Sequence, residues 1–295
     1  MTDLITITND HLTARINPLG AELTSLVDAE GRELMTNADP AFWTGHAPIL
    51  FPVVGRPYRD VIRVDGTEYP MKQHGFARRL PFEVIATSAD GVTFRLTDNE
   101  ETRTHYPFAF ALEIAFQLTG ATLSVDVAVR NTGDVVLPAS FGFHPAFAWP
   151  LPYGQPRADH RIVFAADEPD ALRMIADDGT IAEGERASPL DGRTLALRDA
   201  LFEKDALVWD SVRSDSVTYG AENGPQLRID FPDTPKLGIW TKPSAAYVCV
   251  EPWHGIADPE GYTGEFRDKP GVFEVAAGDT KRIALRVTLA AATAG

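Results

Sequence analysis

Two apolar stretches of the sequence each carry one titratable side chain that is followed at once by a proline. In "ASFGFHPAFAWPL" (139–151) this residue is His144, and in "AYVCVEPWHG" (246–255) it is Glu251. Burying either group is costly unless it is paired or faces a wet cavity. Together the two could transfer protons as an acid–base pair. The structural alternatives are a hydrogen-bonded core histidine and a salt-bridged carboxylate, and the residues alone leave both open.

Three further polar residues lie in stretches that favour ligand contact. Arg56 follows a glycine in "LFPVVGRPYRD", His74 precedes a glycine in "QHGFARRLPF", and Asp205 lies in "LFEKDALVWD". A guanidinium offers a rigid fork of donors to an oxygen-rich ligand, and an aspartate accepts from hydroxyls. Considered alone, Asp205 also fits a turn residue before a strand, and Arg59 and Arg79 fit ordinary surface positions.

Several other kinds of active site find no support in the sequence. The seven histidines show no close metal-binding spacing, and there is no nucleophile elbow, phosphate-binding loop or dinucleotide fingerprint. The single cysteine, Cys249, excludes an internal disulfide and fits a small buried filler.

Composition narrows the partners. The formal net charge of −15 argues against nucleic acid and anionic membranes and mildly disfavours anionic substrates. No apolar run approaches the roughly 20 residues that a membrane helix needs, and the first residues lack the pattern of a signal peptide. We therefore expect a cytoplasmic protein.

The elements that must position these residues are strands. Apolar residues alternate with polar ones in five segments separated by turn signals, which is typical of strands with one wet face. We expect one domain over residues 1–295, an all-β, large antiparallel β-sandwich with few short helices. We also expect a short helix within 39–50, capped by Asp39, and a long loop over 167–194. The five alternating segments are 92–96, 112–118, 123–129, 227–231 and 283–289.

In combination, these stretches resemble the aldose 1-epimerase (galactose mutarotase) family, especially its shorter bacterial branch of LacX-like proteins. The resemblance implies a galactose mutarotase-like sandwich, no cofactor, and interconversion of the α and β anomers of a free sugar. By motif, His144 would be the catalytic acid and Glu251 the catalytic base, while Arg56, His74 and Asp205 would bind the sugar. The matching pieces, from about residue 48 to 290, are "ILFPVVGRPY", "MKQHGFAR", "YPFAFALEIAFQL", "FGFHPAF", "FEKDALVWDSVRSDSV", "LGIWTKPSAAYVCVEPWHG" and "DKPGVFEVAAGDTKRIALRVTL".

Opening a pyranose hemiacetal requires that one proton leave the anomeric hydroxyl and another reach the ring oxygen, so one group must start basic and the other acidic. A glutamate with a pKa of about 4.3 is ionised at neutral pH, and a nearby carboxylate would raise the pKa of a histidine above about 6.5. We expect the two strand ends to face each other across the sugar ring. Trp253, Trp149 or Phe76 could stack on the ring, although core packing also explains each of them.

Four alternatives stay open at this point. The first is a non-catalytic carbohydrate-binding protein on the same fold, and the second is a hexose-6-phosphate mutarotase that would use several arginines. Because Arg78 and Arg79 are neighbours, they would point to opposite faces of a strand, which argues against the second. The third is a glycosidase, which usually employs two carboxylates. The fourth is a structural or partner-binding sandwich without a small-molecule site.

Overall fold

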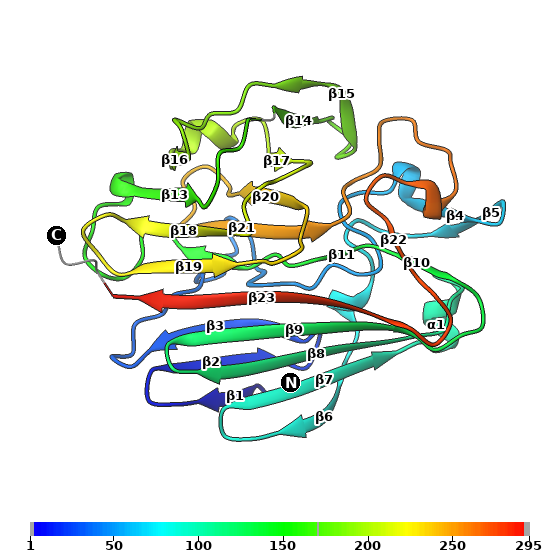
Figure 1. Ribbon diagram of the computed structural model, residues 1–295, viewed down its shortest axis with the longest axis horizontal. Helices are drawn as coiled ribbons and strands as arrows, with labels where there is room; N and C mark the ends of the chain where they lie inside the picture. The colour runs from blue at the N-terminus through cyan, green and yellow to red at the C-terminus, as the bar shows by residue number, and fades with distance from the viewer. Residues whose placement is uncertain (1–2, 170, 292–295) are drawn as a thin grey trace.

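The computed structural model describes residues 3–169 and 171–291. Within them the chain is almost entirely antiparallel β-structure, as the sequence predicts, and the sheets pack as a sandwich (Figure 1). The described residues contain no helix long and apolar enough to cross a membrane. The helical segments in this part of the chain are α1 (Glu100–Arg103) and the 3₁₀ turns η1 (Tyr58–Asp60), η2 (Ala77–Arg79), η3 (Arg157–Asp159), η4 (Asp199–Phe202) and η5 (Phe266–Asp268).

The largest sheet contains all five alternating segments of the sequence. Along β9 every second residue, from Leu123 to Val129, is buried, while Asp126 and Arg130 are exposed, so the sheet has one dry face and one wet face. Within the described residues it has nine strands, in the order β16 (Thr194–Ala196), β13 (His160–Phe164), β18 (Ser216–Ala221), β19 (Gln226–Asp230), β23 (Thr280–Ala290), β9 (Thr122–Asn131), β8 (Phe110–Thr119), β7 (Gly91–Thr97) and β6 (Glu83–Thr87).

A second sheet carries both titratable stretches. Its strand β21 is buried along its whole length, because Val248 and Val250 face the main core and Tyr247 and Cys249 face a smaller apolar cluster. In the described chain this sheet has seven strands, in the order β11 (Phe141–Gly142), β21 (Tyr247–His254), β20 (Lys236–Trp240), β17 (Leu207–Trp209), β14 (Leu172–Ile175) and β15 (Ile181–Arg186), with β12 (Ala146–Ala148) also paired to β21.

Smaller sheets complete the structure. The inward residues of the first three strands join the main core, and β1 lies against β7 and β8. These sheets are β1 (Ile5–Thr8), β2 (Leu12–Asn17) and β3 (Glu22–Asp28); β4 (Val61–Val64) with β5 (Thr67–Pro70); and β10 (Leu137–Ala139) with β22 (Phe273–Val275).

Two local expectations are wrong. The segment 39–50 forms a single turn and no helix: Asp39 does cap Ala41, but the carboxylate of Glu22 then accepts the backbone N–H groups of His46 and Ala47 at a bend, so these groups are not available for helical hydrogen bonds. The segment 167–194, which we expected to be a long loop, contains the hairpin of β14 and β15.

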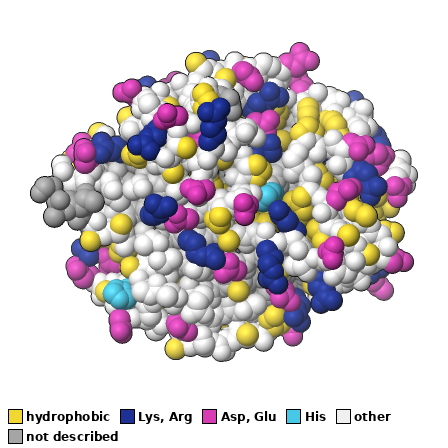
Figure 2. Space-filling view, viewed as in Figure 1, with side chains coloured by type: hydrophobic (Ala, Val, Ile, Leu, Met, Phe, Trp, Pro, Cys, Tyr) yellow, Lys and Arg dark blue, Asp and Glu magenta, His cyan; other side chains and the backbone are white. Residues whose placement is uncertain are grey.

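Charge does not collect in one patch on the face seen in Figure 2, where acidic and basic side chains are intermixed. Acidic and basic side chains therefore neighbour each other on this face.

Candidate active site

Backbone pairing brings His144 next to Glu251. His144 lies in the short break between β11 and β12, and both of those strands pair with β21. On either side of it, Phe143 N–H donates to the carbonyl of Pro252 and Val250 N–H donates to the carbonyl of Pro145. The imidazole Nε2 consequently lies 3.2 Å from Oε2 of Glu251. The two residues are direct neighbours on one sheet, so the expectation of two strand ends facing each other across a ring is wrong.

Burial sets the protonation of this pair. His144 is 8% exposed and Glu251 is 2% exposed. Loss of solvent lowers the pKa of His144 to about 3, and it raises the pKa of Glu251 well above its usual value, with the charge of Asp205 adding to the rise. The empty pair is therefore neutral, with its one transferable proton on Glu251. The expected rise in the pKa of the histidine does not occur, because desolvation outweighs the neighbouring carboxylate.

Two glycines seat the indole of Trp253 beside the pair. A Cβ on Gly142 would lie 2.6 Å from this indole, and one on Gly238 would lie 2.4 Å from it. Gly142 pairs with Trp253 and Gly238 pairs with Glu251 in the sheet. The bare backbone at Gly142 thus accommodates the indole of Trp253.

The pair opens into a cavity of about 290 Å³. This volume is near the lower end of small-molecule pockets, about 300–1,000 Å³, and suits a compact ligand. Its wall comes from loops and strands that are far apart in the sequence: Trp43, Gly55, Gln73, His74, Arg78, His144, Ile175, Gly179, Ile181, Asp205, Ala206, Val208, Trp240, Glu251, Trp253, Ile256 and Ala257. Four of the five residues singled out from the sequence as site residues therefore share one cavity.

His74 is held as a neutral hydrogen-bond donor. Its backbone is left-handed, with φ 64°, and its Nδ1 accepts the N–H of Gly55 at 3.2 Å. Burial, reinforced by the charges of His144 and Arg78, keeps the pKa of His74 well below its usual value. A neutral imidazole whose Nδ1 accepts carries its proton on Nε2. His74 therefore offers an N–H donor to an oxygen acceptor.

Asp205 lies in the cavity wall and has a left-handed backbone conformation that few residue types adopt. Its φ is 69°, a region that aspartate tolerates better than most side chains. One carboxylate oxygen accepts the N–H of Ala206 at 2.7 Å. The other oxygen makes no hydrogen bond to the described residues, and an ionised carboxylate accepts at both.

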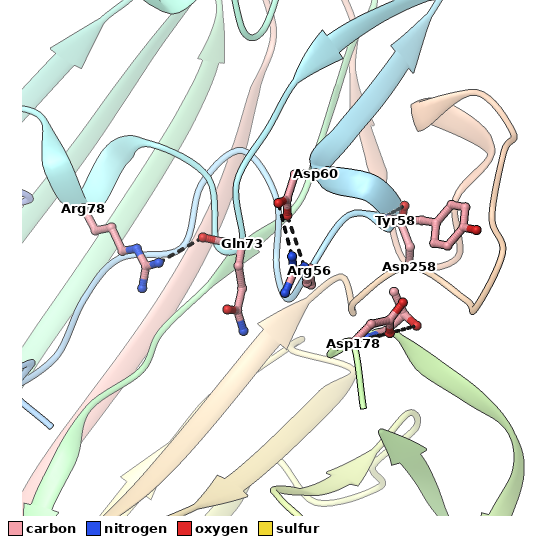
Figure 3. Close-up of polar contacts among 8 residues, drawn as sticks. Arg56, Tyr58, Asp60, Gln73, Arg78, Asp178 and Asp258 are labelled. Carbon is pink, nitrogen blue, oxygen red and sulfur yellow. Dashed lines mark hydrogen bonds and ion pairs between the residues drawn. The ribbon is translucent and has the colours of Figure 1, made fainter. Parts of the chain in front are cut away.

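Arg56 is not among the residues that line the cavity. Its guanidinium is 41% exposed and binds Asp60, with Nε–Oδ1 at 3.1 Å and Nη2–Oδ2 at 3.2 Å (Figure 3). It does touch the rim, since its Cδ would be 3.4 Å from a Cβ on Gly179. The contact of Arg56 with a sugar stays a prediction.

Arg78 supplies the guanidinium that does line the cavity. It lies in η2, so the premise that Arg78 and Arg79 share a strand is wrong, although only Arg78 reaches the cavity. The sequence placed Arg78 beside the "QHGF" stretch but gave no reason to prefer it to Arg56. Its position depends on the turn at His74 and Gly75, where two successive residues have positive φ.

The aromatic wall differs in part from expectation. Of the three candidates only Trp253 lines the cavity, because Phe76 packs on Phe51 and Trp149 is buried with its indole N–H on the carbonyl of Arg157. The other aromatic walls are Trp43 and Trp240, which meet edge to face at 5.6 Å. Trp43 lies in the segment that we expected to be helical, and no pattern in the sequence marked it.

Within the described residues, one set of possible metal ligands is found, comprising His144, Cys249 and Glu251, whose ligand atoms lie within 4.8 Å of one another. Burial raises the pKa of the Cys249 thiol well above its usual value and keeps it protonated. A metal would have to displace that proton and the contact between His144 and Glu251. The arrangement fits proton transfer better than metal binding.

Comparison with known proteins gives a consistent result. Residues 3–259 match the family described as aldose 1-epimerase. The plasmid-encoded protein LacX of Lactococcus lactis subsp. lactis is 31% identical over 295 residues, which cover 97% of this chain and 99% of that protein.

Solved structures agree with the sequence match. A galactose mutarotase related enzyme from Lactobacillus acidophilus superposes with a TM-score of 0.90 at 32% identity, over 99% of this chain and 98% of that one. A galactose mutarotase-like protein from Lactobacillus casei gives a TM-score of 0.88 at 32% identity, over 97% and 100%. The expected galactose mutarotase-like sandwich is confirmed.

Proposed function

Since the chain belongs to the aldose 1-epimerase family, we propose that it interconverts the α and β anomers of a free aldose by acid–base opening and closing of the ring. The observation that carries this proposal is the buried contact of His144 Nε2 with Glu251 Oε2 at 3.2 Å in a cavity wall. A protein that only binds sugar has no need for such a pair, because burying two titratable groups is costly.

The reaction needs one proton held by the pair and one empty acceptor. The unprotonated member removes the proton of the anomeric hydroxyl, so that the C1=O1 bond forms as the C1–O5 bond breaks. The protonated member gives its proton to O5. After rotation about C1–C2, the same steps in reverse close the ring on the other face of the aldehyde. No net proton is consumed, and closure exchanges the roles of the two groups.

Either distribution of the proton satisfies this requirement. The neutral pair and the pair of imidazolium with carboxylate contain the same number of protons, and one transfer across the 3.2 Å contact converts them. With His144 as acid and Glu251 as base, the second form reacts. Sugar hydroxyls and the N–H of His74 are the polar groups that would stabilise it once water has been excluded.

Binding rests on the other polar groups of the wall. His74 donates to a sugar oxygen and Asp205 accepts from a hydroxyl, while Trp43, Trp240 and Trp253 cover the apolar face of the ring. Arg56, at the rim, would contact the sugar only after leaving Asp60.

Polarimetry of freshly dissolved α-D-glucose and α-D-galactose tests the proposal. We expect the approach to anomeric equilibrium to be accelerated in proportion to enzyme concentration, without release of sugar from aryl glycosides. Sugar-dependent thermal stabilisation with no acceleration for any aldose would instead establish a non-catalytic binding protein.

A further inference from the structure

Arg78 is a cavity residue whose charge has no opposite partner among the described residues. Its Nη2 donates to the carbonyl of Gln73 at 3.0 Å (Figure 3), and its Nε is buried without a hydrogen-bond partner in the described chain. The acid whose charge acts on it most is Glu22, but the carboxylate of Glu22 already accepts the N–H groups of His46 and Ala47 at 2.7 and 3.0 Å.

Such an arrangement is costly in the empty protein. Burial and the nearby charge of Arg79 lower the pKa of Arg78 to about 10. A guanidinium stays protonated at neutral pH even so, and a partly buried charge is stabilised by a paired anion. An anionic group on a ligand in the cavity would therefore meet a guanidinium that no described acid pairs.

The cavity has a positive charge on one side of the His144–Glu251 pair and a negative charge on the other. The charge of Arg78 lowers the pKa of both His74 and His144. The charge of Asp205 acts on the other member and raises the pKa of Glu251. The guanidinium donates to the carbonyl of Gln73, next to His74, whose ring lies 5.8 Å from that of His144, so Arg78 lies towards the histidine end of the cavity. Asp205 comes just before β17, where Val208 pairs with Gly238, and Gly238 pairs in turn with Glu251, so Asp205 lies towards the Glu251 end.

This polarity fixes which part of a sugar meets which charge. In the proposed reaction His144 serves the ring oxygen O5, and Glu251 serves the hydroxyl on C1. C5 and its exocyclic carbon C6 are attached to O5, so they extend towards the histidine end. C2 is attached to C1 and extends towards Asp205, which accepts from its hydroxyl. The group at C6 is thus the part of the ligand that meets Arg78.

We propose that the preferred substrates are hexuronates, aldoses with a carboxylate at C6, and that Arg78 is the residue that selects them. This inference rests on the proposed epimerase function. One guanidinium fork matches one carboxylate in two parallel hydrogen bonds. The side-chain amide of Gln73, another residue of the wall, adds a neutral donor.

A phosphate at C6 fits less well. It carries more charge than one guanidinium neutralises. The other two arginines nearby are engaged elsewhere, since Arg79 donates to the carbonyl of Gly75 at 3.1 Å and Arg56 binds Asp60. The carboxylate of Asp205 in the same cavity further disfavours a dianion.

The test compares anomerisation of D-glucuronate, D-glucuronamide, D-glucose and D-glucose 6-phosphate, each corrected for its uncatalysed rate. A charge-assisted pair predicts kcat/KM for glucuronate about 10- to 100-fold above that for glucose. Glucuronamide should behave like glucose, because it keeps the shape of glucuronate without its charge. Equal values for glucuronate and glucose, or the highest value for the phosphate, would overturn the inference.

Two neighbouring variants localise the effect. In Arg78→Gln the ratio of kcat/KM for glucuronate to that for glucose should fall at least tenfold, whereas in Arg79→Gln the ratio should match that of the parent. An unchanged ratio in Arg78→Gln overturns the role of Arg78. If the parent accelerates no aldose at all, the epimerase proposal itself fails, and this is distinct from a parent that accelerates glucose and glucuronate equally.

Discussion

The nine-stranded and seven-stranded sheets are built on different burial patterns. Along β9 of the first, exposed residues interrupt the buried ones, whereas all eight residues of β21 in the second are buried. β9 therefore has water on one face, whereas β21 is covered on both. Each sheet buries titratable side chains, but His160 and Tyr219 of the first are hydrogen-bonded to backbone groups, whereas His144 and Glu251 of the second face a cavity.

Each sheet also has a hollow of similar size, and the two differ in chemistry. The outer face of the nine-stranded sheet has one of about 310 Å³, whose charged members include Glu113, Asp126 and Arg282. There Glu113 forms a solvent-exposed ion pair with Arg95, and its side chain is 38% exposed. The cavity beside β21 is about 290 Å³ and holds Glu251. Volume does not distinguish the two hollows. Burial does, because it favours the neutral forms of His144 and Glu251.

The strongest test of this difference between the two hollows is to remove one carboxylate from each. Glu251→Gln keeps the shape but deletes the proton carrier, so catalysis should fall by about 10⁴-fold or to the uncatalysed rate. Glu113→Gln should leave the rate unchanged and cost less than about 1 kcal/mol, as exposed ion pairs do. Polarimetry on both variants checks this. Parental activity in Glu251→Gln would remove Glu251 from the mechanism.

His144→Asn should lower activity by about 10²–10⁴-fold, because an asparagine cannot supply the proton. Nδ1 of His144 has no hydrogen-bond partner among the described residues, and the carboxyl of Glu251, which loses its contact with Nε2, faces the cavity, where water can reach it, so the melting temperature should change little. Thermal unfolding monitored by tryptophan fluorescence, together with the rate, distinguishes a proton donor from a structural histidine. A variant destabilised by about 1–3 kcal/mol, with full activity per folded molecule, would make His144 a structural residue.

Two glycines, one in each sheet, allow the same comparison for packing. In Gly238→Ala the new Cβ would be 2.4 Å from the indole of Trp253, and in Gly91→Ala it would be 2.3 Å from the side-chain oxygen of Gln117. The indole is packed in the cavity wall, whereas Gln117 is flexible and can move aside. Gly238→Ala should therefore lose about 1–3 kcal/mol by overpacking and about tenfold in kcat/KM by displacing Glu251.

For Gly91→Ala we expect a stability change within about 0.5 kcal/mol and parental kinetics. Melting curves and kcat/KM for both variants test the contrast, and equal losses at the two glycines would contradict it.

The same contrast explains how much the sequence could predict. Strict alternation locates β7, β8, β9, β19 and β23, because one wet face leaves its period in the residue types. No period marks β21, but one carboxylate in an apolar run is conspicuous because its burial needs an explanation. Four of the five residues expected in the site lie in one cavity on this basis.

The remaining features depend on contacts between distant segments. The protons of the pair cannot be placed from reference pKa values, because the desolvation of His144 comes from the folded cavity. The choice between Arg56 and Arg78 depends on the partner that each finds, which is Asp60 for one and none of the described acids for the other. Trp43 lies in the wall beside a bend at His46 and Ala47, whose N–H groups bind Glu22 on the distant strand β3.

The smallest expected effect concerns the acid limb of the pH profile. The pair works with one proton, so activity is lost at low pH when a second proton binds. If the limb reflected an ordinary glutamate, its midpoint would be at about 4.3. In the folded protein the proton already lies on Glu251, so the second one must bind His144, whose pKa burial lowers to about 3. A lowered pKa means that protonation, and with it the loss of activity, requires a lower pH.

At pH 4 the enzyme should therefore retain about nine-tenths of its kcat/KM, against about one-third for the ordinary glutamate, a difference of about threefold. Rates measured from pH 3.5 to 6 test this, with fluorescence confirming that the protein stays folded and a return to pH 7 restoring full activity. A midpoint at or above pH 4.3 in folded protein would show that the cavity does not keep His144 neutral, and the two hollows would then differ less than their burial implies.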